Sequence, residues 1–205
     1  MEETKFLYGA SGHCKVIIDI LNGNNVKIKA IFDDNPRDKQ LNSIPVFETD
    51  QLKNLTDGEI IVSIGDNKTR KKIASLLKLS FFTAIHKSAI ISETSSIGEG
   101  TVIMPNAVVN ADSVIGKHCI INTSAVIEHD CKINDYVHIS PQVALAGNVT
   151  VGEGTHIGIG ASVIQGIIIG IGVTIGAGAV IINDVPDYAV VVGNPGNIIK
   201  YNLDI

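Results

Sequence analysis

The chain has 205 residues, enough for one domain of average size beside a smaller one, and carries a net charge of -5 at pH 7. Only 4% of the residues are aromatic and Trp is absent, so the core must be layered from aliphatic side chains, which suits a repeat. The acidic balance excludes a basic surface for nucleic acid. Apolar runs are interrupted within a few residues, which argues against membrane insertion.

The cysteines indicate the compartment in which the protein works. Three cysteines without a CxxC spacing do not form a disulfide framework or a zinc site, and they are typical of small buried residues under reducing conditions. The N-terminus shows no secretory signal pattern. We therefore expect a cytoplasmic protein that needs no metal.

The N-terminal part alternates short apolar stretches with glycine turns and helical stretches, which predicts an α/β unit. Parallel strands joined by helices form a doubly wound sheet, of which this segment contains about half. The predicted elements are strands over residues 5–8, 28–32 and 59–64 and helices over residues 16–21 and 68–78.

Small and acidic residues follow each predicted strand of this unit. Open α/β sheets bind ligands at the carboxyl ends of their strands, and a carboxylate about twenty residues after the glycine turn often contacts a ribose. The unit is too short for a whole dinucleotide, so we expect residues 1–84 to bind a nucleotide-sugar. Gly9, Gly12, Asp33 and Gly65 all fall at this edge.

An aliphatic residue recurs at every sixth position from Ile85 to Ile181, seventeen times in succession. The residue four positions later is mostly small or β-branched, which predicts a two-faced short strand followed by a turn. Period six matches neither an α-helix nor a heptad repeat. Three such hexads form one triangular coil, so residues 85–205 are expected to form a parallel β-helix with a C-terminal tail.

Histidine is the side chain best suited to act as a general base near neutral pH. His129 stands directly before Asp130 near the middle of the repeat, and a carboxylate can orient an imidazole and raise its basicity. The same pair could equally be a surface pair at a turn. His138 could approach His129 only across a corner of the coil or from another subunit. His118 and His156 occupy turn-like positions, where we expect them to be exposed.

Glycines mark two further candidate sites. Ala146-Gly147-Asn148 could present backbone N–H groups to an oxyanion, although Gly147 could also serve only a turn. Residues 158–179 lack large side chains at several outward positions, which would leave a groove for a slender ligand.

In combination these motifs resemble the PglD/NeuD-like group of sugar acyltransferases, especially the UDP-4-amino-sugar N-acetyltransferases of bacillosamine biosynthesis. The resemblance covers both parts of the chain. It rests on Tyr8-Gly9-Ala10-Ser11-Gly12-His13, Phe32-Asp33-Asp34, Ile64-Gly65-Asp66-Asn67, Arg70-Lys71-Lys72, Ile85-His86-Lys87-Ser88-Ala89, Val126-Ile127-Glu128-His129 and Ala146-Gly147-Asn148.

The resemblance implies a left-handed β-helix, a homotrimer with active sites between subunits, and acetyl-CoA as co-substrate. It implies that His129 deprotonates the amine of a nucleotide-linked amino sugar, with Asp130 as its acidic neighbour. The related enzymes typically have Glu at that neighbouring position, so the identity of the sugar stays open. The resemblance also implies that the uridine and pyrophosphate are contacted by Ser11, Gly12, His13, Asp33, Asp34 and Gly65. It places four residues near acetyl-CoA: His138, Gly147, Ile159 and Ala177.

Three alternatives remain at this stage. The same fold and co-substrate could serve an O-acetyltransferase of sialic acid or another glycan hydroxyl. A β-helix could also be a non-catalytic binding protein. A metal enzyme of the carbonic anhydrase type would require histidines that converge on zinc, for which His118, His129 and His138 have a suggestive spacing.

Overall fold

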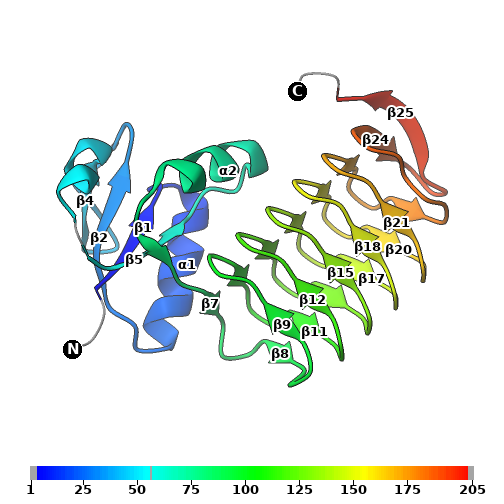
Figure 1. The fold of residues 1–205 in the computed structure, drawn as a ribbon, viewed down its shortest axis with the longest axis horizontal. Coiled ribbons are helices and arrows are strands. Elements are labelled where there is room, and N and C mark those ends of the chain that lie inside the picture. The colour runs from blue at the N-terminus through cyan, green and yellow to red at the C-terminus, as the bar shows by residue number, and fades with distance from the viewer. Residues whose placement is uncertain (1–3, 56, 203–205) are drawn as a thin grey trace.

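The computed structural model describes residues 4–55 and 57–202 and shows an α/β unit packed beside a long prism of short strands (Figure 1). The elements of the first unit are β1 (Lys5–Tyr8), α1 (Gly12–Gly23), β2 (Ile28–Asp33), β3 (Gln40–Leu41), β4 (Ile44–Glu48), the 3-10 helix η1 (Thr49–Asn54), β5 (Glu59–Val62), α2 (Asn67–Leu76) and β6 (Ser80–Phe81).

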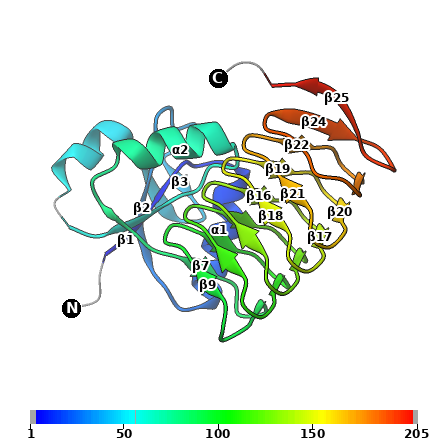
Figure 2. The same ribbon diagram turned by 45° about the vertical axis from the view of Figure 1, so that its right-hand side comes forward.

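The first unit is a sheet with the strand order β3-β4-β2-β1-β5-β6, in which β3 is antiparallel to β4 and the other pairs are parallel. Side chains alternate along each strand, so Leu7 and Ile31 face α1 while Phe6 and Phe32 pack on the side of α2. Helix α1 lies between this sheet and the prism (Figure 2). Both parts therefore share one apolar cluster.

The predicted elements of this unit are confirmed, with shifted ends. The strand over 28–32 also includes Asp33, the strand over 59–64 ends at Val62, and the helix over 16–21 begins at Gly12. The sequence did not indicate β3, β4, η1 or β6. Among the described helices, none is long and apolar enough to cross a membrane.

Each hexad forms one strand of the prism. Its strands are β7 (Ala84–Ile85), β8 (Ile90–Ile91), β9 (Ser96–Ile97), β10 (Val102–Ile103), β11 (Val108–Val109), β12 (Val114–Ile115), β13 (Ile120–Ile121), β14 (Val126–Ile127), β15 (Lys132–Ile133), β16 (His138–Ile139), β17 (Ala144–Leu145), β18 (Thr150–Val151), β19 (His156–Ile157), β20 (Ser162–Val163), β21 (Ile168–Ile169), β22 (Thr174–Ile175) and β23 (Val180–Ile181).

These strands form three parallel sheets that run the length of the prism. The first sheet contains β7, β10, β13, β16, β19 and β22. The second sheet contains every third strand from β8 to β23, and the third contains every third strand from β9 to β21. Every strand therefore pairs with the strand one coil further along the chain. The hexad prediction is confirmed, and the architecture is a left-handed parallel β-helix.

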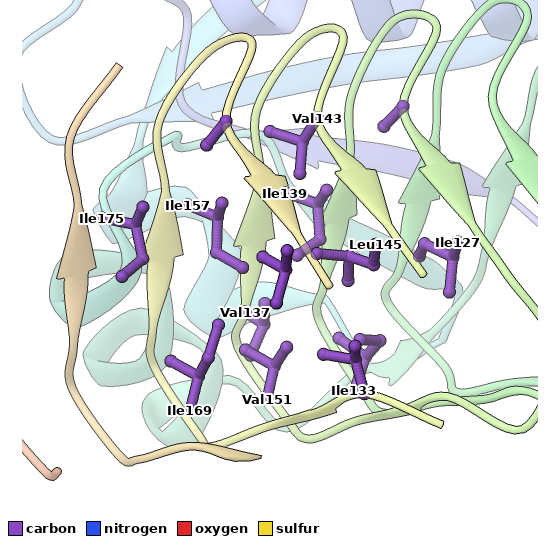
Figure 3. Packing of buried hydrophobic residues seen from close by; sticks show 14 of the residues in the cluster. Ile127, Ile133, Val137, Ile139, Val143, Leu145, Val151, Ile157, Ile169 and Ile175 are labelled. Atoms are coloured by element: carbon purple, nitrogen blue, oxygen red, sulfur yellow. The ribbon is translucent and has the colours of Figure 1, made fainter. Parts of the chain in front are cut away.

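The interior of the prism is built from stacked side chains of similar shape. The aliphatic residue that ends each strand points inward, and neighbouring coils place Ile139, Ile157 and Ile175 in line (Figure 3). Buried hydroxyls complete the backbone pairing. For example, Thr101 Oγ1 donates to the Gly116 carbonyl at 2.8 Å and accepts from the Cys119 amide at 2.9 Å. The buried hydroxyl of Thr101 is thus fully hydrogen-bonded, so its burial carries no penalty for an unpaired polar group.

From Gly100 to Gly178, the turns between strands place one residue with a positive φ in each hexad. Glycine fills this position in several turns, whereas Asp130 (φ 61°) and Asn148 (φ 59°) fill it on the edge between the second and third sheets. Short polar side chains tolerate this left-handed conformation better than bulky ones. The expected C-terminal tail is a hairpin, β24 (Ala189–Val192) with β25 (Asn197–Tyr201), which extends the first sheet.

Candidate active site

A cavity of about 540 Å³ opens where β1 and β2 end, beside the N-terminus of α1. Three of the predicted ligand residues line it, namely Ser11, Gly12 and Asp33. Asp33 Oδ2 accepts from the Ala10 amide at 2.7 Å and Oδ1 accepts from the Asn35 amide at 2.9 Å, so its carboxylate is held in place. A helix N-terminus with free N–H groups at one end of a cavity suits a phosphate-bearing ligand.

The other predicted ligand residues of this unit do not line that cavity. Asp34 Oδ1 accepts from the Tyr8 hydroxyl at 2.6 Å and from Thr49 Oγ1 at 3.0 Å. Burial, together with this carboxylate, raises the pKa of Tyr8. Asp34 therefore joins β1, β2 and η1 to one another.

His13 lies at the start of α1, close to the prism. Burial lowers its pKa to about 4, and the nearby Arg70 contributes to the shift. Its Nε2 atom is buried and has no hydrogen-bond partner among residues 4–55 and 57–202. A neutral imidazole with an unused nitrogen is thus present beside the α1 N-terminus.

A second cavity, of about 710 Å³, lies between the N-terminus of α2 and the outer face of the first sheet. Gly65, His138 and His156 line it, together with Tyr136 from the edge between the third and first sheets. This cavity is therefore lined both by the segment that follows β5 and by the prism. The structure therefore brings the predicted residues Gly65 and His138 together, although the two were expected to contact different ligands.

His138 is held in place by contacts with His156, Asn122 and the Gly65 backbone. Its ring stacks on His156 with centroids 4.7 Å apart, and its Nε2 lies 3.1 Å from Asn122 Nδ2. The ring also interacts with the Gly65 backbone. Burial lowers the pKa of His138 to about 3, and nearby His156 and Arg70 add to this effect. His138 is therefore held in place as a neutral ring, and its lowered pKa makes it a poor proton acceptor.

His129 has the opposite surroundings, on the edge between the second and third sheets. Its side chain is 62% exposed, and Nδ1 lies 2.7 Å from Asp130 Oδ2. This hydrogen bond raises the pKa of His129. With Nδ1–H donated to the carboxylate, the lone pair of Nε2 points away from Asp130 and is available to accept a proton.

Gly147 lies one coil beyond His129 on the same edge. The Asn148 amide donates to the His129 carbonyl at 2.8 Å, and a Cβ atom at Gly147 would stand 2.6 Å from His129 Cε1. No side chain therefore fits between the imidazole and the next coil. This contact explains why residue 147 is a glycine. It also places the Gly147 backbone beside the His129 ring.

One expectation about the histidines was right and another was wrong. His156 is exposed, as expected, although its ring also stacks on His138 and its Nε2 lies 2.8 Å from Ser140 Oγ. His118 was expected to be exposed, but it is only 3% exposed, because its ring stacks on Tyr136 and meets the edge of Phe81. The α/β unit covers this part of the prism, which the sequence pattern did not reveal.

Sequence reasoning also missed Asn122 and Arg70 as site residues. Asn122 occupies an ordinary turn position, and only the tertiary structure places it beside His138. Arg70 was noted only within the Arg70-Lys71-Lys72 motif, yet it is almost completely buried between the two parts of the chain. A signal existed for Arg70, since a helix that packs on a sheet buries one side regardless of charge.

The remaining predicted residues lie on different edges of the prism. Ile159 and Ala177 occupy the edge between the first and second sheets, whereas His129 and Gly147 occupy the edge between the second and third. The α/β unit packs on the outer face of the first sheet through Val102 and Ile120. His129 therefore lies at the edge opposite the covered face, and one chain does not bring it to the cavity beside the N-terminus of α1.

Zinc ligation by the three histidines is not favoured by this arrangement. His118 is enclosed by rings, His138 is held by Asn122, and His129 stands on another edge. Within the described ranges, no group of three His, Cys, Asp or Glu side chains is arranged to hold a metal ion.

The fold combines a hexapeptide-repeat β-helix, of the kind found in bacterial transferases, with an N-terminal α/β unit. Residues 6–77 match the family model of the PglD N-terminal domain. Residues 94–129 and 112–147 match the model of the bacterial transferase hexapeptide. The chain belongs to the PglD family of hexapeptide-repeat sugar acetyltransferases.

Solved structures resemble the whole chain. PerB from Caulobacter crescentus, in complex with CoA and GDP-perosamine, is 36% identical with a TM-score of 0.92, and the match covers 98% of this chain and 99% of that one. The acetyltransferase domain of PglB from Neisseria gonorrhoeae, in complex with acetyl coenzyme A, is 37% identical with a TM-score of 0.90, covering 97% and 100%.

A curated relative is similar over a shorter stretch. The UDP-N-acetylbacillosamine N-acetyltransferase of Bacillus subtilis (strain 168) is 44% identical over 107 residues. The match covers 48% of this chain and 50% of that relative, so the chain is matched to about half of the relative's length.

Proposed function

We propose that the protein is a cytoplasmic, acetyl-CoA-dependent N-acetyltransferase that acylates the 4-amino group of a nucleotide-linked amino-deoxy sugar. The UDP-4-amino-4,6-dideoxyhexoses are the acceptors expected from the sequence motifs. One observation carries the proposal: an exposed histidine, oriented by Asp130 and pressed against the Gly147 backbone, stands on a prism edge. A base with a free Nε2 beside a bare backbone matches the needs of acyl transfer to an amine.

Direct transfer follows from the properties of these residues. The amine is protonated near neutral pH and must lose a proton to attack the thioester carbonyl. His129 Nε2 accepts that proton, Asp130 holds the imidazolium, and backbone N–H groups near Gly147 stabilise the developing oxyanion. The tetrahedral intermediate then collapses to the amide as the C–S bond breaks, and the second amine proton passes to the departing sulfur, so that CoA leaves as the thiol.

A covalent intermediate on cysteine is not part of the proposal. Cys131 is close to His129 in sequence, but its side chain is buried within the prism and Sγ donates to the Ala146 carbonyl at 3.3 Å. Burial raises the pKa of Cys131, so the thiolate is disfavoured. This supports a mechanism in which the amine attacks acetyl-CoA directly.

A homotrimer would complete the active site. In one chain His129 and the nucleotide cavity lie on opposite sides of the prism, so the acceptor must meet the His129 of a neighbouring subunit. The second sheet presents Ile90, Val108, Val126 and Val180 outward, and Ile90 is strongly exposed. Apolar faces of this kind are typically covered by identical copies.

The decisive assay offers acetyl-CoA with UDP-, GDP- and dTDP-linked 4-amino-6-deoxy sugars and follows the release of free thiol. We expect release with at least one amine and none with the matching 4-hydroxy sugar. Thiol release with sialic acid or another hydroxyl acceptor, and with none of the amines, would replace this proposal with O-acetyl transfer.

Mixed oligomers test the shared site separately. His129→Ala and Asp33→Ala subunits, each impaired alone, are denatured together and refolded in equal amounts. Random assembly predicts recovery of about a quarter of the wild-type activity, because one intact His129 then meets one intact nucleotide cavity at that fraction of interfaces. No recovery would contradict a site built from two subunits.

A further inference from the structure

Arg70 is a buried cation that links the two parts of the chain. It lies in α2 and is 1% exposed. Its guanidinium donates to five neutral acceptors within 3.0 Å. These are the carbonyls of Ile64, Gly65, His118 and Tyr136 and the Oδ1 atom of Asn67.

The acceptors fall into two groups. Ile64, Gly65 and Asn67 belong to the turn between β5 and α2, whereas His118 and Tyr136 lie on successive coils of the edge between the third and first sheets. The planar fork of an arginine can span both groups at once, which the single ammonium of a lysine cannot. Arg70 thereby fixes the turn that follows β5 relative to the prism.

Stability alone does not account for a charge at this place. Burying an ion costs several kcal/mol of desolvation, and apolar residues of similar volume often replace buried ions without loss. Burial lowers the pKa of Arg70 only to about 10, so it stays charged at neutral pH. The charge and the fork geometry therefore need another explanation.

The turn that Arg70 holds is part of the site. The Gly65 carbonyl accepts from Arg70, and the Gly65 backbone also interacts with the His138 ring. Gly65 and His138 both line the second cavity. Because Gly65 follows β5, next to β1 and its glycine turn, a sugar attached to a nucleotide in the first cavity would extend toward this turn.

We propose that Arg70 is a positioning residue for acetyl transfer, which clamps the Gly65 turn against His138 so that the acceptor sugar is presented in one orientation to the attacking edge of a neighbouring subunit. This inference rests on the proposed function. Arg70 touches no substrate in this scheme and acts through Gly65 and His138.

The charge of Arg70 acts on the same histidines. It lowers the pKa of His138 and His156, in each case after the larger effect of burial. The other groups facing His138 are His13, Asn122 and the Gly65 backbone. His156 is faced by Ser140 and Asp66. Removing the cation should let both rings protonate closer to neutral pH, which would place a positive charge beside an acceptor that must itself lose a proton.

Two variants separate geometry from charge. Arg70→Lys keeps the charge and loses the fork, and Arg70→Met loses both at similar length. Lys72→Met, an exposed site on the same helix, is the matched control. Each variant is compared with the wild type for oligomeric state, thermal melting, kcat and KM for both substrates, and calorimetric affinity for the bare nucleoside diphosphate.

For Arg70→Met we expect kcat/KM for the nucleotide amino sugar to fall about 100-fold, the size of loss that follows misplacement of a reacting group. We expect KM for acetyl-CoA and the affinity for the bare nucleotide to change less than about twofold, since neither depends on the Gly65 turn. Arg70→Lys should recover part of kcat/KM.

Three results would overturn the inference. One is wild-type kcat/KM in folded Arg70→Met, and another is an equal loss of affinity for all three ligands. The third is a loss of activity that follows only the fraction of folded protein. Failure of the proposed function is distinguishable, because the wild type would then release no thiol with any nucleotide amino sugar.

Discussion

Two histidines nine residues apart in the repeat occupy opposite chemical environments. His129 stands on a free edge with a carboxylate partner, and its pKa is raised. His138 lies on a sheet face covered by the α/β unit, where burial lowers its pKa to about 3. The repeat is the same at both places. The contrast teaches that the chemistry of a β-helix residue depends on whether its edge or face is covered.

The strongest test of this contrast is His129→Ala. We expect kcat to fall roughly 1000-fold, within the range for loss of a general base, because no other neutral imidazole stands on that edge among the described residues. Thermal melting should stay unchanged, since the side chain is mostly exposed. His86→Ala serves as the matched control, and His129→Ala with more than a tenth of wild-type kcat would remove His129 from the mechanism.

The next largest effect is expected for Gly147→Ala. The new Cβ would displace the His129 ring from its place against the next coil, so we expect a roughly 100-fold lower kcat at saturating substrates. Gly23→Ala is the control, because its Cβ would meet open space at the end of α1. Equal activity of the two alanine variants would show that the contact with the ring is unimportant.

Asp130→Asn tests the contrast between His129 and His138 through the pH dependence of kcat/KM. Asp130 raises the pKa of His129, and the base works only when neutral, so activity declines as pH falls through that pKa. Without the carboxylate the pKa returns toward its usual value, and the acidic limb of kcat/KM should shift to lower pH. We also expect about tenfold lower kcat at the plateau, because the imidazole is less well oriented. A limb that stays in place would separate Asp130 from the base.

The smallest effects distinguish the two adjacent aspartates of the α/β unit. Asp33→Asn should raise KM for the nucleotide sugar about tenfold, equivalent to about 1.4 kcal/mol, since Asp33 lines the first cavity. Asp34→Asn should leave KM unchanged and lower the free energy of unfolding by about 1 kcal/mol through its bonds to Tyr8 and Thr49. Steady-state kinetics and urea unfolding measure the two effects, and the reverse assignment would contradict the structure.

The regular part of the fold was predictable because its determinants are local. Period six alone specifies which side chain enters the prism, so every strand from Ala84 to Ile181 followed from the sequence. The α/β unit was predictable from its apolar stretches and glycine turns, with errors at the ends of elements. The strands β3, β4 and β6 are short or carry little periodic signal, and β4 is recognisable only once it pairs with β2.

The candidate site was predictable in part. His129 and Asp130 are neighbours in sequence, and their contact needs only a corner, so the pair could be inferred. The contact of Gly147 with His129 required the coil length, which places residues eighteen apart above one another. The burial of His118 and the contact of Asn122 with His138 could not be inferred, because they depend on where the α/β unit docks.

The sequence by itself determined the prism, the glycine turn after β1 and the pairing of His129 with Asp130, since each depends on residues close in the chain or on a strict period. Only the tertiary structure decided which histidines are neutral and covered, that Asp33 rather than Asp34 faces the cavity, and that Arg70 joins the two parts. The physical reason is that burial and hydrogen bonding across domains arise from long-range packing, which local pattern does not specify.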